Sequence, residues 1–291
     1  MPLEHRVTPC YFTPTIPRLP ISRLKSKNFN YQKLITFFSF IYFAAYRLSK
    51  FEVIAMGPSD RMLALLCCLA NQGEAMTVKS LAELTAQPVS TAYRHLRQLL
   101  AWGLVSEREG GTYAPGPQAV RLHQGFEHHN ELLRWARPVL TELTETTQES
   151  SALLVAVRDH ALCVEMIDSP QPLRCCYHRG QVQPLLKGAS ARALLAWMSD
   201  EERQMALMLR SEAERDDALI DLETIRLRGV AVSVGEIDQG VWGASAPVFN
   251  GRGRLKAVIS VMAPSARAQD RAETLSEATR LSAQRLGELL Q

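Results

Sequence analysis

The chain has few cysteines, and their spacing excludes two common uses of this residue. Six cysteines occur in 291 residues, and no two have the C-x-x-C spacing of a zinc knuckle or a thiol–disulfide motif. Two pairs are adjacent, Cys67-Cys68 and Cys175-Cys176, which favours reduced thiols. Cys163, Cys175 and His178 could together hold a metal ion, but buried apolar thiols explain the cysteines better. We therefore predict neither a metal nor a cofactor.

The sequence also lacks the residue patterns of common enzyme classes. It has no Ser-His-Asp order, no glycine-rich phosphate loop and no set of metal ligands, so it is not predicted to be an enzyme. Internal repeats and low-complexity segments are missing as well. One alternative stays open, a small-molecule enzyme built on the C-terminal half, because pockets serve catalysis and sensing alike.

The excess of positive charge lies entirely in the first 55 residues. The net charge is +3, but residues 1–55 hold eight Lys and Arg against two Asp and Glu, and residues 56–125 hold six against five. The first segment also contains seven of the nine Phe and an uncharged run of 13 residues at 34–46. About 20 residues are needed to span a membrane. We expect the native protein to begin at Met56, with the preceding residues untranslated or disordered; a signal peptide and a membrane tether are the alternatives.

Residues 77–116 have the pattern of a winged helix-turn-helix, which reads DNA. Thr77 can cap a first helix, and Ala86-Gln87 forms the turn. Pro88 opens a second helix, which ends at Gly103. The apolar side of this second helix carries Val89, Ala92, Leu96, Leu99 and Leu100. A short hairpin follows, with strands expected at 104–106 and 113–114 and a turn at 109–112. Residues 56–117 are therefore predicted to form a DNA-binding domain.

The other side of the second helix is polar and suits a recognition helix. Hydroxyls in its first turn can hold phosphate oxygens, and Arg94 and Arg97, one turn apart, can reach a guanine edge. Tyr93 and His95 flank the two faces. A solvated helix face would show the same residues, but the helix-turn-helix-hairpin order favours DNA. The predicted contacts to double-stranded operator DNA are Thr77, Ser90, Thr91, Tyr93, Arg94, Arg97 and Gln98.

After the wing the chain changes character. Residues 118–147 are predicted as linker helices with a break near Pro138. Residues 148–291 mix strands and helices in the manner of an α+β domain with its own core. Strands are expected at 151–158, 162–167, 173–177, 230–233, 241–249 and 255–262. Helices are expected at 189–198, 200–209 and 212–228, with a last helix capped by Ser265.

These segments, taken in order, resemble the IclR family of bacterial transcription regulators. The resemblance runs from residue 60 to about 289. In the first domain it is carried by the motifs at 81–84, 88–91, 94–96 and 102–105. In the second domain it is carried by 179–180, 184–185, 189–196, 228–230, 235–236, 240–249 and 260–264. No single motif decides the match; their order and spacing across two domains make it specific.

The resemblance implies an N-terminal winged helix, a helical linker and a C-terminal GAF-like effector-binding domain. It implies a cytoplasmic homodimer or dimer of dimers, whose operator affinity responds to a small organic or aromatic acid. The family's effector positions fall on Leu186, Ala189, Ser190, Ser233, Val241, Gly243, Ser260 and Met262. The sequence departs from the family at Lys187-Gly188, Gly243 and Met262. The effector, the target genes and the choice between repression and activation therefore stay open.

The residues themselves are compatible with an acid site at 188–191. Free N–H groups at a helix start after Gly188 would favour a carboxylate, aided by the helix dipole. Trp197 and Trp242 are either aromatic walls of this site or core residues. Lys187 could add a positive charge, although an exposed lysine explains it better.

Overall fold

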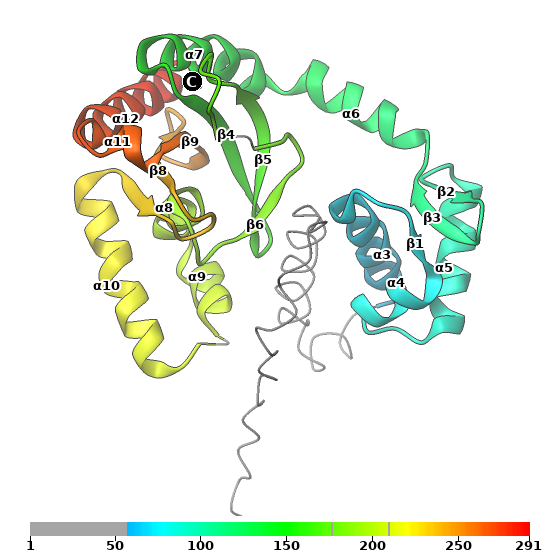
Figure 1. Ribbon diagram of the computed structural model, residues 1–291. Helices are drawn as coiled ribbons and strands as arrows, with labels where there is room; N and C mark the ends of the chain where they lie inside the picture. Colours follow the sequence, from blue (N-terminus) through cyan, green and yellow to red (C-terminus); the bar gives the residue numbers. More distant parts are fainter. Residues whose placement is uncertain (1–56, 176, 209) are drawn as a thin grey trace, which may run out of the picture. The chain divides into compact units, whose positions relative to one another are not determined.

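The computed structural model describes residues 57–175, 177–208 and 210–291 (Figure 1). The chain divides between residues 55 and 56 into two units, and all that follows concerns the second. The predictions for residues 1–55 and for the native start lie outside the described residues. Within the described part, no helix is long and apolar enough to cross a membrane.

The first domain is the predicted winged helix-turn-helix. Its elements are α3 (Pro58–Gln72), β1 (Met76–Thr77), α4 (Val78–Leu84), α5 (Val89–Ala101), β2 (Val105–Arg108) and β3 (Thr112–Pro115). Thr77 caps α4, because its side chain accepts a hydrogen bond from the Ser80 amide at 3.2 Å. Pro88 is the residue before α5 rather than its first residue, so the predicted start is one residue early. Three antiparallel strands in the order β1-β3-β2 form the wing.

The end of α5 is joined tightly to the segment that leaves the wing. Gly103 has the predicted left-handed conformation, with a φ of +67°. The Gly116 amide donates to the Leu104 carbonyl at 2.8 Å, and the Gln118 amide donates to the Gly103 carbonyl at 3.1 Å. A Cβ atom at Gly116 would lie 2.3 Å from the Gly103 oxygen, which no side chain permits. Glycine is therefore required at position 116.

The linker consists of two helices, but they do not meet at the predicted place. Helix α6 (Gln118–His129) ends at Asn130, whose side chain caps α7 (Glu131–Thr147) by accepting from the Leu133 amide. Pro138 lies inside α7, so the predicted break near this residue is wrong. The buried face of α7 offsets the missing hydrogen bond of a proline, about 3 kcal/mol in a helix interior. That face consists of Leu133, Ala136, Val139, Leu140, Leu143, Thr144 and Thr147.

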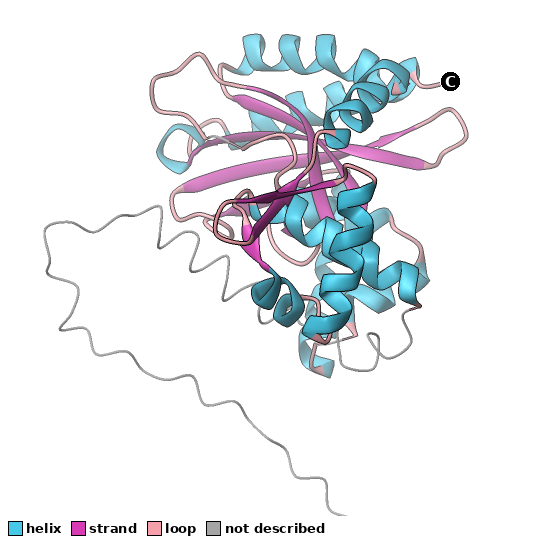
Figure 2. Ribbon diagram, turned by 90° about the vertical axis from the view of Figure 1, so that its right-hand side faces the viewer, coloured by secondary structure: helices cyan, strands magenta, loops and turns pink. Residues whose placement is uncertain are grey.

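The second domain is built on one antiparallel sheet of six strands in the order β6-β5-β4-β9-β8-β7 (Figure 2). The strands are β4 (Ser150–Val157), β5 (His160–Ile167), β6 (Val182–Pro184), β7 (Ala231–Val234), β8 (Val241–Phe249) and β9 (Leu255–Pro264). The helices are α8 (Ala189–Trp197), α9 (Asp200–Leu207), α10 (Glu212–Arg228), α11 (Ser265–Ala268) and α12 (Ala272–Leu289). The predicted α+β class and most element positions are confirmed.

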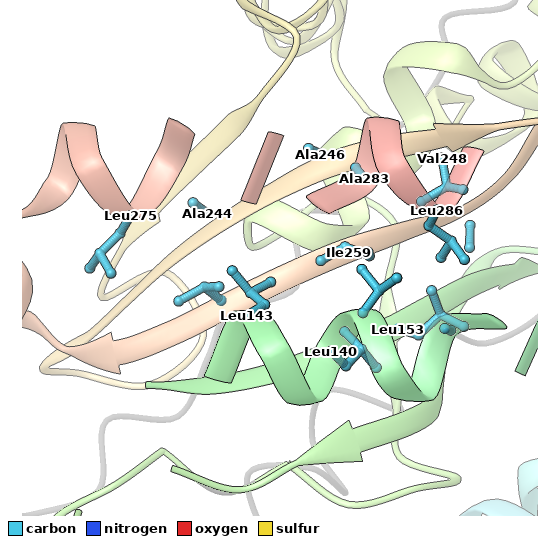
Figure 3. Packing of buried hydrophobic residues seen from close by; sticks show 14 of the residues in the cluster. Leu140, Leu143, Leu153, Ala244, Ala246, Val248, Ile259, Leu275, Ala283 and Leu286 are labelled. Atoms are coloured by element: carbon cyan, nitrogen blue, oxygen red, sulfur yellow. The ribbon is translucent and has the colours of Figure 1, made fainter. Parts of the chain in front are cut away.

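Helices cover both faces of this sheet, and alternate residues of the central strands serve the two layers. On one face, Leu140 and Leu143 of α7 and Leu275 and Leu286 of α12 belong to one buried cluster with Ile259 of β9 (Figure 3). The other face carries α8, whose Ala191, Leu194 and Leu195 are buried in a second core with α10 behind it. The family-like segment around α8 therefore lies on the layer opposite to α7.

Two predicted elements of this domain are wrong. The segment 173–175 is not a strand, because its carbonyl groups are bonded by side chains from elsewhere. The Cys175 carbonyl accepts from Ser150 Oγ at 2.8 Å, and the Leu173 carbonyl accepts from Arg267 Nη1 at 2.9 Å. Ser265 does not cap the last helix, since it is the first residue of the short α11 and α12 begins seven residues later at Ala272.

Candidate DNA interface and effector site

The polar side of α5 is exposed, as a recognition surface requires. Ser90, Tyr93, Arg94, Arg97 and Gln98 are exposed, whereas Thr91 is half-buried. Thr77 is exposed too, but its hydroxyl is engaged in capping α4. The structure thus gathers five of the predicted DNA-contacting side chains on one helix face. Contact with DNA itself stays a prediction for all of them.

A buried polar contact holds this helix against the preceding turn. His95 is only 3% exposed, so its predicted place at the edge of the polar face is wrong. Its Nδ1 lies 3.1 Å from Gln87 Oε1, and Gln87 Nε2 donates to the Arg61 carbonyl at 2.9 Å. Burial lowers the pKa of His95, and the positive charges of Arg94 and Arg61 lower it further. A neutral imidazole therefore fixes α5 to the turn and to α3.

The apolar side of α5 is confirmed except at its first residue. Ala92, Leu96 and Leu99 are buried among residues of α3 and α4. Val89 is 44% exposed, although the helical periodicity places it on the apolar side. It begins the helix, and the first buried contact of α5 is made one turn later by Ala92.

Six of the eight predicted effector positions come together between α8 and one end of the sheet: Ala189, Ser190, Ser233, Gly243, Ser260 and Met262. Strand pairing places Ser233, Gly243 and Met262 side by side on β7, β8 and β9. A Cβ atom at Gly243 would lie 3.5 Å from Ser233 Oγ and 3.9 Å from Ala189 Cβ, so this row faces the start of α8. A methyl group at 243 would thus just fit, so helix and sheet lie close together at this point.

Three buried serine hydroxyls lie beside this row and bond to one another. Ser190 Oγ is 2.9 Å from Ser260 Oγ, and Ser245 Oγ is 2.7 Å from Ser260 Oγ and 3.2 Å from Ser190 Oγ. Ser190 and Ser260 were expected here, but Ser245 was not. The two-residue period of a strand could have found it, because Ser245 follows Gly243 on the same face of β8.

A carboxylate already occupies the position before α8. Gly188, with a φ of +83°, donates its amide to Glu236 Oε2 at 2.9 Å, and Glu236 Oε1 lies 2.8 Å from Arg192 Nη2. Ile237 covers the same place, since a Cβ atom at Gly188 would lie 3.0 Å from its Cγ1. The Gly188 amide is therefore already engaged, and the free N–H groups expected in the helix start after Gly188 stay a prediction. The sequence marked Gly235-Glu236 as a family motif but gave no sign that this loop folds onto α8.

The remaining residues proposed for the site lie at its margin or outside it. Leu186 and Val241 are half-buried, and so is Lys187, which was expected to be exposed. Trp242 is buried in the layer of α7 and α12, so it cannot be a wall of a site on the α8 side. Trp197 ends α8 and packs edge-on against Phe249, with ring centroids 5.9 Å apart. Trp242 is therefore a core residue, whereas Trp197 is half-buried against the core on the α8 side.

The cysteines behave as structural thiols wherever they are buried. Burial raises the pKa of Cys163 to about 12 and that of Cys68 to about 11. Cys67 is exposed and Cys175 is half-buried. In the part of the chain that the structure describes, no group of three or more His, Cys, Asp and Glu side chains could hold a metal ion.

Family models match both domains. The IclR helix-turn-helix domain matches residues 59–109, and the C-terminal domain of bacterial IclR transcriptional regulators matches residues 124–287. The chain belongs to the IclR family of bacterial transcription regulators. This family consists of regulators rather than enzymes, and the winged helix is the part that implies DNA binding.

Individual relatives agree with this assignment. The chain is 30% identical over 230 residues to the transcriptional regulator BhcR of Paracoccus denitrificans, covering 75% of this chain and 82% of that protein. It is 26% identical over 212 residues to the regulator KipR of Bacillus subtilis, covering 69% and 84%. A crystal structure of an IclR regulator from Silicibacter sp. TM1040 has the same fold, with a TM-score of 0.73 at 24% identity over 80% of this chain and 96% of that one.

Proposed function

We propose that a small organic acid binds between the start of α8 and strands β7–β9, and that it changes the affinity of this regulator for its operator. The observation that carries the proposal is the buried hydroxyl cluster of Ser190, Ser245 and Ser260. The cluster adjoins the row of Ser233, Gly243 and Met262, which faces Ala189 at Gly243. Hydroxyl groups in such a place can donate to a carboxylate that the helix dipole also attracts.

An acid suits this place because its charge needs several donors once it is buried. An ionised carboxylate without hydrogen bonds is too costly to take out of water. The Gly188 amide and the Arg192 guanidinium already bind the carboxylate of Glu236. The start of α8 therefore already binds one carboxylate, and an external acid that used the same donors would have to displace Glu236. The effector must bind the two DNA-affinity states unequally, since equal binding would shift nothing.

Catalysis by the same serines has no support in their contacts. Among the described residues, the three hydroxyls bond to one another rather than to a histidine or a carboxylate. A serine nucleophile needs an adjacent general base. Without such a base these hydroxyls are not activated for attack on a ligand.

We further infer that two copies act on one operator. The first domain offers few cations, and a second copy would double the contacts made through Arg94 and Arg97. Light scattering of the free protein and of its complex with an operator fragment tests this inference. A single copy per operator would contradict it.

Filling the proposed site tests its role directly. Screening carboxylic acids by thermal shift identifies an acid that stabilises the protein, and operator titration shows whether the acid changes DNA affinity. Ala189→Trp should abolish both responses and keep basal operator binding, whereas Ala213→Trp, at an exposed residue of α10, should keep all three. An unaltered response in Ala189→Trp would place the effector elsewhere.

A gentler variant covers the case in which tryptophan disturbs folding. Ser260→Ala removes one hydroxyl donor and leaves the packing almost unchanged. Loss of a hydrogen bond to a charged group is worth roughly 1.5–3 kcal/mol, so the acid should bind about tenfold or more weakly. Isothermal titration measures this change, and wild-type affinity in Ser260→Ala would refute the proposed site.

A further inference from the structure

An ion-pair cluster joins the linker to the effector-binding domain. Four side chains take part, each from a different segment: Glu127 of α6, Arg137 of α7, Glu165 of β5 and Arg179 of the loop between β5 and β6. Arg137 lies 2.6 Å from Glu127 and 2.5 Å from Glu165. Arg179 lies 3.3 Å from Glu127 and also pairs with Glu165. We call these four residues the Glu127 cluster.

Each arginine of the Glu127 cluster therefore bridges both carboxylates. The Glu165 side chain is fully buried, and a buried carboxylate is strongly destabilising unless it is paired. Two guanidinium groups compensate it, and Glu127 balances the second positive charge. The hydrogen bond from Arg137 lowers the pKa of Glu127, which keeps this carboxylate ionised.

The Glu127 cluster matters for α6 because this helix has little else to hold it. None of the twelve residues of α6 is buried, whereas seven residues of α7 are. The last turn of α6 is thus attached to the second domain through charge rather than through apolar packing. Its attachment depends on where Arg137 and Arg179 stand.

Arg179 is in turn tied to the neighbourhood of the effector site. Two residues before it, Tyr177 donates its hydroxyl to Gln183 Oε1 at 2.6 Å. That oxygen lies 3.5 Å from where a Cβ atom at Gly188 would stand. On the other side of Arg179, the Gly180 amide donates to the Cys163 carbonyl at 2.8 Å, which fixes the loop to β5. A shift at Gly188 can therefore reach Arg179 through the adjacent Gln183 side chain, its hydrogen-bond partner Tyr177 and the two residues of backbone that follow.

We propose that the Glu127 cluster is the switch contact through which the effector site controls the linker helix. Movement of Gly188 and Gln183 shifts Tyr177 and changes the bridge from Arg179 to Glu127, while Arg137 keeps Glu165 paired. The last turn of α6 is then held or released. This inference rests on the proposed function, since it assigns a consequence to occupancy of that site.

A double-mutant cycle tests the connection without any effector, so its result does not depend on where an acid binds. Tyr177→Phe removes the hydroxyl next to the site, and Glu127→Gln removes the charge on α6. The readouts are operator affinity and hydrogen exchange of the α6 amides in the two single variants and the double variant. We expect the effect of Tyr177→Phe on operator affinity to differ about fivefold or more between the wild-type background and the Glu127→Gln background, the lower end of typical allosteric coupling.

Two controls sharpen the result. Glu145→Gln removes an exposed charge of α7 and should combine additively with Tyr177→Phe. Arg179→Gln removes the bridge from the other side and should reproduce the coupling seen with Glu127→Gln. Additive behaviour of Tyr177→Phe with both Glu127→Gln and Arg179→Gln would overturn the inference. Failure of the acid screen with a coupled cycle would refute the proposed effector and leave the switch contact standing.

Discussion

Arg94→Ala tests DNA recognition by α5 without disturbing the stability of the domain. The side chain is exposed on the polar face of the helix, so Arg94→Ala should change the free energy of unfolding by less than about 0.5 kcal/mol. A guanidinium that binds a guanine edge with two hydrogen bonds is worth roughly 1–3 kcal/mol in base discrimination. Operator affinity should therefore fall about 5- to 150-fold for each half-site contact.

The assay separates a contact to a base from a contact to phosphate. Fluorescence anisotropy with operator DNA at several salt concentrations gives both the affinity and its salt dependence. Loss of a phosphate contact reduces the slope of log affinity against log salt concentration by about one and weakens binding to all DNA sequences alike. Loss of a base contact relaxes the preference for one base at one position of the operator. Arg252→Ala, in the exposed turn between β8 and β9, is the matched control. Wild-type affinity and wild-type discrimination in Arg94→Ala would remove this residue from the reading surface.

Two further predictions concern the buried His95 and the hydrogen-bonded Glu236. The pKa of His95 is lowered in the folded state. As the pH falls, the unfolded chain therefore takes up a proton on this residue before the folded protein does, near the ordinary histidine pKa of about 6.5. The contribution of His95 to stability should be complete above that pH and fall below it; thermal unfolding between about pH 5 and 8 should show a flatter profile for His95→Gln, and equal profiles would contradict this. Glu236→Gln should raise the affinity for the acid found by screening about tenfold, because it weakens the internal competitor at Gly188 and Arg192. Unchanged or weaker binding in isothermal titration would contradict that competition.

The DNA-binding domain could be predicted from the sequence because its signals are local. The cap at Thr77, the turn before Pro88 and the apolar spacing in α5 each involve residues within a few positions of one another. The burial of His95 could not be predicted in this way. A helical wheel places it at the boundary of the two faces, and only its bond to Gln87 in the preceding turn draws it inward.

In the linker and the second domain, tertiary contacts overruled local preferences. Proline usually ends a helix, yet Pro138 lies inside α7 because the residues around it pack into a core. The residues at 173–175 were predicted to be part of a strand, yet Ser150 and Arg267 donate hydrogen bonds to carbonyl groups of this segment. Neither partner is near these residues in the sequence, so no local pattern could reveal them.

The candidate effector site was predicted by resemblance more than by physics. The family positions at Ala189, Ser233 and Gly243 do meet, and the strand register explains why. Ser245 could have been found from the period of β8. The place of Glu236 could not, because it requires the loop after β7 to fold back over the start of α8.

The glycine between wing and linker has a mechanical consequence. Gly116 lets the backbone pass close to Gly103, and the Gly116 and Gln118 amides donate hydrogen bonds across this contact. The start of α6 and the end of α5 are therefore joined rigidly. The other end of α6 is a break at Asn130, where the helical hydrogen bonding is interrupted. Helix α6 is thus held rigidly to α5 at its start and can rotate about Asn130 at its end. Any rotation of α6 at Asn130 would therefore be passed on to α5, the predicted recognition helix.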